Sequence, residues 1–139
     1  MTPSQIALVR ENFAAVKPIA ATAAALFYDR LFALDPSLRP LFKSDLRAQG
    51  AKLMQMIGAA VASLHAPETL VPTLHRLGRR HRGYGVEDRH YATVGEALIW
   101  TLEKGLGPAF TAEARAAWLA AYGLLAGVMQ AGAAQAHAA

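Results

Sequence analysis

The chain has 139 residues, of which 54% are hydrophobic and 17% are charged, and it contains no cysteine. A chain of this length and composition forms a single domain with a real core, which excludes an intrinsically disordered protein. The lack of cysteine excludes disulfides, thiolate metal sites and thiol nucleophiles, and it fits a reducing, cytoplasmic setting. The formal net charge is +4, and its densest part is a run of arginines at positions 76, 79, 80 and 82. A nucleic-acid partner would need a longer basic face with interleaved aromatic side chains, so none is expected.

The ends of the chain carry no targeting signal that we can identify. No cationic segment followed by an apolar one occurs at the start, so no signal peptide is predicted. The longest apolar run, residues 116–129, is too short to span a bilayer, so we expect a buried core helix and no membrane insertion. Residues 1–134 are expected to form the domain, and the alanine-rich residues 135–139 a disordered tail.

Helical signals occur in every segment, and no alternating strand pattern is present. A first helix is predicted to begin after Thr2, which is followed by a proline and, three residues after the cap, a glutamine. It should end near Lys17, because Pro18 follows. The further helices are expected at residues 18–33, 36–42, 46–64, beyond Pro67 to Gly83, 87–104 and 111–130. The sequence therefore predicts an all-α domain of six or seven helices.

His81 is the first candidate functional residue. It continues a stripe formed by Leu70, Leu74 and Leu77, at spacings that place all four side chains on one face of a helix. An imidazole on such an apolar face needs either a hydrogen-bond partner or a metal. A lone histidine there is more often a satisfied core residue, so this segment alone favours the hydrogen-bonded alternative.

Two polar side chains on neighbouring predicted helices change that balance. Gln49 lies on the inward stripe of Leu53, and a buried amide without partners costs about 1–3 kcal/mol. Tyr28 lies on an apolar face, with a hydroxyl that also needs a partner. Phe42 falls in the connection between the two helices. Together with His81, these residues suggest a buried polar ligand held between helices.

The same residues form a pattern that resembles the globins. It runs from Asp35-Pro36 through Phe42 and Gln49 to His81, which precedes Gly83-Tyr84-Gly85-Val86. More narrowly, the chain is similar to bacterial single-domain globins of the flavohaemoglobin-like group. The most specific stretches are residues 26–28, 31–32, 52–54, 78–81 and 90–91, with Trp118 and Tyr122-Gly123 in the last helix. The resemblance covers essentially the whole chain and implies the globin fold, a three-on-three helical sandwich around a haem pocket.

This resemblance also implies a role for each candidate residue. Haem b would be held by His81 as the proximal iron ligand. Phe42 would stack on the porphyrin, while Tyr28, Gln49 and Leu53 would line the distal side. The other residues expected to contact the haem are Leu77, Tyr91 near His81, Arg80 at the haem edge, and Lys52 toward a propionate, for which a solvated surface lysine is a nearly equal alternative.

For function, the resemblance implies reversible, high-affinity binding of O2, and also of CO and NO, for oxygen storage, delivery or scavenging. The alternative is a nitric oxide dioxygenase served by a separate flavin reductase, because the flavin and nicotinamide domains of flavohaemoglobins lie beyond the end of this chain. The family's proximal glutamate corresponds to Ala133, which breaks the hydrogen-bond triad with histidine and tyrosine and favours binding over catalysis. A haem-free regulatory helical domain, with Tyr28, Gln49 and His81 as ordinary core residues, remains the third hypothesis.

Overall fold

A computed structural model describes residues 1–43 and 45–138, with side chains described as far as residue 134. This part of the chain holds six α-helices and no strand. The helices are α1 (Pro3–Val16), α2 (Ala20–Leu34), α3 (Leu46–Ala62), α4 (Val71–Gly83), α5 (Asp88–Leu106) and α6 (Ala112–Ala138). Short 3-10 helices connect them: η1 (Lys17–Ile19), η2 (Pro36–Leu41), η3 (Pro67–Leu70) and η4 (Gly107–Ala109). The prediction of an all-α domain is confirmed.

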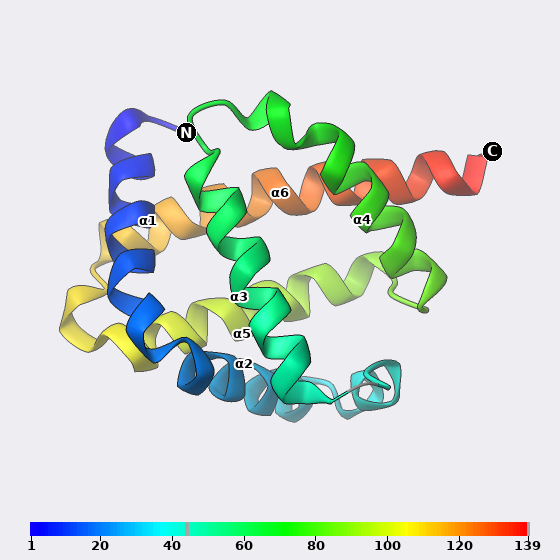
Figure 1. Cartoon of the computed structure of the whole chain (residues 1–139), viewed down its shortest axis with the longest axis horizontal. Coiled ribbons are helices and arrows are strands. Elements are labelled where there is room, and N and C mark those ends of the chain that lie inside the picture. The colour runs from blue at the N-terminus through cyan, green and yellow to red at the C-terminus, as the bar shows by residue number, and fades with distance from the viewer. Residues whose placement is uncertain (44, 139) are drawn as a thin grey trace.

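The helices form two layers of three. In Figure 1, α1, α3 and α4 lie in front and cross over α2, α5 and α6, so that the arrangement is the expected three-on-three sandwich. The most extensive contacts join α4 to α6 and α2 to α5, followed by α2 to α3 and α1 to α6. Each helix of the front layer therefore rests on a different part of the back layer.

The helix starts follow local side-chain chemistry. Thr2 accepts a hydrogen bond from the Gln5 amide at 3.1 Å while the Gln5 side chain accepts from the Thr2 amide at 3.0 Å, which is the predicted capping box. Thr111 caps α6 through the Ala114 amide, as predicted. The sequence analysis did not identify Asp45, which caps α3 by accepting from the Arg47 amide at 3.2 Å.

The end of the last helix differs from the prediction. The backbone of α6 continues to Ala138, whereas the expected end was near residue 130. An alanine-rich sequence contains no stop signal. Gly132 lies inside the helix, where it faces the backbone of His75 on α4. The side chains of residues 135–138 and the whole of residue 139 lie outside the described part of the chain. The predicted disordered tail over residues 135–139 therefore stays a prediction.

The stretch Ala112–Ala134 of α6 is long and apolar enough to cross a membrane, with a mean hydropathy of 1.3 and 33% of it buried. Core helices of soluble proteins meet the same criterion, and one such helix is weak evidence for a membrane span. Ala117, Trp118 and Ala121 of this helix are buried in the main core cluster, as expected for a core helix.

Trp118 joins α6 to α1 in the centre of that core. It is 3% exposed, and its Nε1 donates a hydrogen bond to Oδ1 of Asn12, which is 6% exposed, at 3.2 Å. Both polar groups are therefore satisfied without water. Since an unpaired buried donor is costly, this bond should matter more than a surface hydrogen bond would.

We expect Asn12→Ala to lower the free energy of unfolding by about 1–3 kcal/mol, because the indole N–H is left without its acceptor. Urea unfolding of the wild type and variant measures the loss. Glu11→Ala, at the exposed neighbouring position, is the control and should change stability by less than about 0.5 kcal/mol. Equal stability of the Asn12 variant and the control would show that the bond contributes nothing.

Two glycines allow α4 and α6 to approach each other closely. A Cβ on Gly78 of α4 would lie 1.9 Å from the carbonyl oxygen of Met129, and a Cβ on Gly132 of α6 would lie 2.4 Å from the Cα of His75. Both distances are far below any possible contact, so only glycine fits at either position. The backbone of α4, which carries His81, is thereby held directly against the backbone of α6.

Candidate functional site

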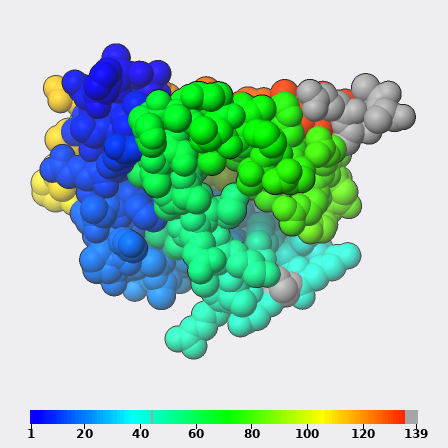
Figure 2. All heavy atoms as spheres, turned by 45° about the horizontal axis from the view of Figure 1, so that its top comes forward, coloured from blue at the N-terminus to red at the C-terminus, as the bar shows by residue number. Residues whose placement is uncertain are grey.

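The site lies where two helices of the front layer diverge. α4 packs along α6, and α3 packs on α2 and α1, while α3 and α4 hardly touch each other. Figure 2 shows the molecular surface hollowed between these two helices. Partly buried apolar side chains from three elements, among them Phe42, Leu53 and Val94, pack around the aromatic cluster of α2. The gap is thus bordered by apolar groups that are incompletely covered by protein.

His81 lies in the last turn of α4 and is held in one orientation. Its Nδ1 lies 2.7 Å from the carbonyl oxygen of Leu77, and because a carbonyl can only accept, Nδ1 carries the proton. Nε2 then has a free lone pair, and it makes no hydrogen bond to any residue of the described chain. Burial lowers the pKa of the His81 imidazole, against the raising effect of the Leu77 bond, and nearby Arg80 lowers it further. A neutral, oriented imidazole with an open Nε2 is the form that binds a metal ion.

Tyr28 is the second polar group of the site. It lies on α2, is 4% exposed, and packs edge-on against Phe42 and Phe27 with ring centroids 5.4 Å and 5.2 Å away. Its hydroxyl makes no hydrogen bond within residues 1–43 and 45–138. Burial raises the pKa of Tyr28 to about 12, so the hydroxyl remains protonated near neutral pH. The site therefore contains a protonated donor, on a buried tyrosine, that no described residue uses.

The third predicted polar residue, Gln49, precedes the point at which α3 packs most closely on α2. A Cβ on Gly50 would lie 2.8 Å from the Cβ of Ala24 and 3.7 Å from Cε2 of Tyr28, so α3 rests directly on α2 at this point. Gln49 precedes Gly50 and is partly buried. The sequence analysis missed Gly50, since a glycine within a helix gives no indication of what packs against it.

The remaining predicted contact residues are less closely gathered. Leu53 packs against the aromatic cluster of Tyr28, and Leu77 is partly buried and supplies the carbonyl that orients His81. Lys52 and Arg80 are exposed on α3 and α4, respectively. Their predicted contacts with the haem stay predictions.

Tyr91 is partly buried on α5, and burial raises the pKa of its hydroxyl. The structure gives no hydrogen bond between Tyr91 and His81 in the described chain. Instead, the backbone carbonyl of Tyr91 accepts a hydrogen bond from the Tyr122 hydroxyl at 2.6 Å. Ala133 is 4% exposed on α6, so the position of the expected proximal glutamate is buried and apolar. The role of Tyr91 beside His81 stays a prediction.

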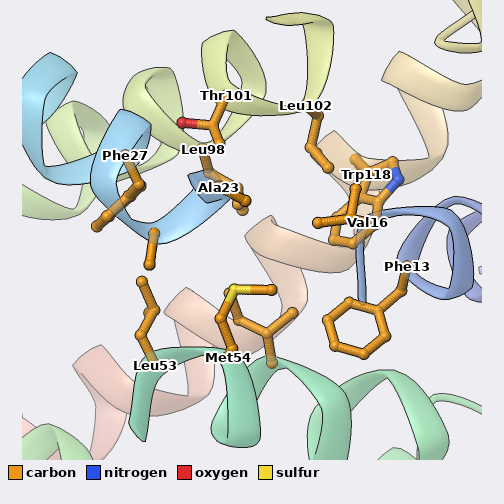
Figure 3. A pocket seen from close by; sticks show the side chains of 12 residues that line it. Phe13, Val16, Ala23, Phe27, Leu53, Met54, Leu98, Thr101, Leu102 and Trp118 are labelled. Carbon is orange, nitrogen blue, oxygen red and sulfur yellow. The ribbon is translucent and has the colours of Figure 1, made fainter. Parts of the chain in front are cut away.

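A small apolar cavity lies beyond Leu53 and Phe27, and the sequence analysis did not identify it. Figure 3 shows side chains from several helices pointing into it, with Thr101 as the one labelled hydroxyl-bearing residue. That hydroxyl donates to the carbonyl of Ala97 at 2.8 Å, so it offers little to a solute. The space open to the centre of a water-sized molecule is about 20 Å³, enough for one small solute. The lining residues are Phe13, Val16, Ala23, Ala24, Phe27, Leu53, Met54, Ile57, Leu98, Thr101, Leu102 and Trp118.

These residues fit a haem. Partly buried apolar side chains of α3 and α5, next to Phe42, are incompletely covered by protein, and a flat apolar ring system would cover them. His81 supplies a neutral nitrogen ligand, and Tyr28 supplies a protonated hydroxyl that makes no hydrogen bond to a described residue. No group of three or more histidine or acidic side chains that could hold a bare metal ion occurs in the described residues.

Comparisons with known proteins agree with this assignment. The family profile described as Globin matches residues 25–129. Neuroglobin of Danio rerio is 33% identical over 90% of this chain and 87% of its own length. A flavohemoprotein of Bordetella parapertussis is 34% identical over 93% of this chain, which spans only 33% of that relative. A solved structure described as an engineered carbene transferase, from a putative nitric oxide dioxygenase of Rhodothermus marinus, has a TM-score of 0.89 at 29% identity and covers 99% of this chain and 96% of its own.

Proposed function

This chain belongs to the globin family of haem-binding proteins, and we propose that it holds haem b through His81 and binds dioxygen reversibly. Haem iron bound to one histidine supplies an open coordination position for a diatomic ligand. The observation that carries the proposal is Tyr28, a residue that is 4% exposed and whose protonated hydroxyl makes no hydrogen bond to any described side chain. An ordinary core tyrosine would have its hydroxyl satisfied.

The side chains around this position favour a polar diatomic ligand. Dioxygen accumulates negative charge when it binds to ferrous iron, and a hydrogen bond to a charged acceptor contributes about 1.5–3 kcal/mol. In this proposal, Tyr28 donates such a bond, with Gln49 on α3 as a second donor. Carbon monoxide accumulates less charge and should gain less. Since every 1.4 kcal/mol corresponds to about tenfold in affinity, we expect tight binding and slow release of dioxygen.

Replacing Tyr28 with phenylalanine tests this role. We expect Tyr28→Phe to raise the dioxygen dissociation rate by about tenfold or more, because one donor is lost while the ring remains. Stopped-flow replacement of dioxygen by carbon monoxide measures this rate. The control Glu11→Ala changes an exposed residue of α1 and should leave the rate unchanged. An unchanged rate in Tyr28→Phe would remove Tyr28 from the mechanism.

A second candidate function, nitric oxide dioxygenase, is favoured by the solved structure that matches 99% of the chain, which is described as a putative enzyme of that kind. Conversion of nitric oxide and dioxygen into nitrate consumes one electron in each turnover, so sustained activity requires an electron donor. The apolar side chain at Ala133 favours ligand binding over this catalysis, since a buried methyl group cannot accept a hydrogen bond from the proximal side. Nitric oxide consumption with a flavin reductase and NADH separates the two functions: a rate no faster than that of reductase alone favours the oxygen-binding protein.

A further inference from the structure

The outer face of α4 concentrates the positive charge of the protein. Four arginines, Arg76, Arg79, Arg80 and Arg82, lie exposed on this helix of 13 residues, which contains no acidic residue. These four charges equal the net charge of +4 of the whole chain, so the rest of the chain is electrically balanced. We call this surface the α4 arginine face.

Among the residues whose side chains are described, the arginines of this face make no ion pair with an acidic side chain. The described ion pairs involve Arg89, His90 and Arg115, all outside α4. Arg76 reaches only the hydroxyl of Thr73, at 3.4 Å. The guanidinium groups of the α4 arginine face are therefore free to meet an external anion.

Helix stability alone does not account for the α4 arginine face. Cations in the last turn of a helix are stabilised by its dipole, which explains Arg80 and Arg82 but not Arg76 and Arg79. Like charges three or four residues apart destabilise a helix, and Arg76 has such a neighbour at both Arg79 and Arg80. A surface that costs stability in the free protein is consistent with use in binding.

The α4 arginine face lies close to the proposed iron ligand. His81 belongs to the same helix, whose diameter with side chains is about 10–12 Å, so a partner on the outer face lies within one helix thickness of it. Tyr84, just beyond α4, is 63% exposed, and its ring centroid lies 6.3 Å from that of His81. An exposed aromatic ring therefore touches the proximal imidazole at the edge of the charged surface. Exposed aromatic side chains and arginine are enriched at protein interfaces.

From this juxtaposition we propose that the α4 arginine face is the docking surface of an acidic, one-electron carrier protein that reduces the haem. The inference rests on the proposed function, in which oxidation leaves ferric iron that no longer binds dioxygen. In the step, the reduced carrier loses one electron and ferric iron becomes ferrous, with no bond made or broken in the protein. α4 is about 20 Å long, which suits the small, charge-steered interfaces of electron-transfer complexes. Nucleic acid is disfavoured because the basic surface is confined to one short helix.

The test uses the haem-loaded protein and a two-iron ferredoxin of acidic surface as the probe. The variant R76Q/R79Q removes two charges of the α4 arginine face, and K17Q/R115Q removes two from exposed positions on η1 and α6. At about 20 mM salt we expect R76Q/R79Q to slow reduction by reduced ferredoxin at least about tenfold, and K17Q/R115Q to slow it less than about twofold. The wild-type rate should fall steeply by about 200 mM salt, where surface charges are screened. Reduction by dithionite, a small molecule that needs no docking surface, should be equal in all three proteins.

A binding measurement complements the rates. Calorimetry with oxidised ferredoxin, in which no electron is transferred, should show weaker binding to R76Q/R79Q and unchanged binding to K17Q/R115Q. Equal rates and affinities in the two variants would overturn the docking surface. So would tight binding of duplex DNA through the same arginines without any loss of ferredoxin reduction. Haem absorption and dioxygen binding, measured separately on each protein, report on the proposed function: if they are normal and docking fails, only this inference is wrong.

Discussion

His81→Ala is expected to abolish haem retention. Among the described residues, the imidazole is the neutral, oriented nitrogen ligand at the divergence of α3 and α4, and alanine would leave the iron without it. After reconstitution with haem and gel filtration, the variant should show almost none of the Soret absorbance of the wild type. Because the substitution leaves a space of about the size of the lost ring, added imidazole should restore much of that absorbance.

The control for this experiment is another histidine outside the site. His65 is exposed, and its Nδ1 lies 2.9 Å from the Arg10 guanidinium, so His65→Ala should retain full Soret absorbance. A haem-free regulatory domain predicts no Soret band in any of the three proteins. Full absorbance in His81→Ala would show that the iron is held elsewhere.

Gly78→Ala is expected to destabilise the fold by about 2 kcal/mol. The new methyl group would overlap the carbonyl oxygen of Met129, and a backbone atom cannot move aside as a flexible side chain can. Overpacking of this kind costs about 1–3 kcal/mol and occasionally more, which exceeds the gain of about 1 kcal/mol from replacing glycine by alanine in a helix. Urea unfolding of the haem-free protein measures the effect, and weaker haem retention should accompany it because α4 carries His81.

Gly127→Ala is the matched control for this substitution. Gly127 lies within α6, and a Cβ there would have no neighbour within 4 Å. Only the helix propensity changes, so this variant should be more stable than the wild type by about 0.5–1 kcal/mol. If both glycine variants were equally stable, the close contact of α4 with α6 would be absent in solution.

The sequence predicted the local features well, because they depend on residues adjacent along the chain. Thr2 and Thr111 mark helix starts through hydrogen bonds that span three residues, and the leucine stripe places His81 on an inward face. Tyr28 was recognisable because its apolar neighbours recur at helical spacing. The family resemblance then assigned roles to residues that periodicity alone leaves as core polar groups.

Two of the features that were missed, the Asp45 cap and the end of α6, are local, and the others depend on what lies opposite in space. Gly50 and Gly78 look alike in sequence, yet one faces Ala24 and the other the backbone of Met129. The extension of α6 beyond residue 130 was missed because alanine gives no termination signal. Apolar periodicity also does not distinguish a filled core from one that encloses a cavity, because a sequence pattern does not report how side chains from different helices meet.

The small apolar cavity beside Leu53 also bears on how the protein responds to compression. Space that packing leaves empty in the folded state is lost when the chain unfolds and water surrounds every side chain, so the system then occupies less volume. Hydrostatic pressure therefore acts against this fold through the cavity. A solute that occupies the cavity removes part of that void, and a dissolved gas at high concentration should make the protein harder to unfold by pressure.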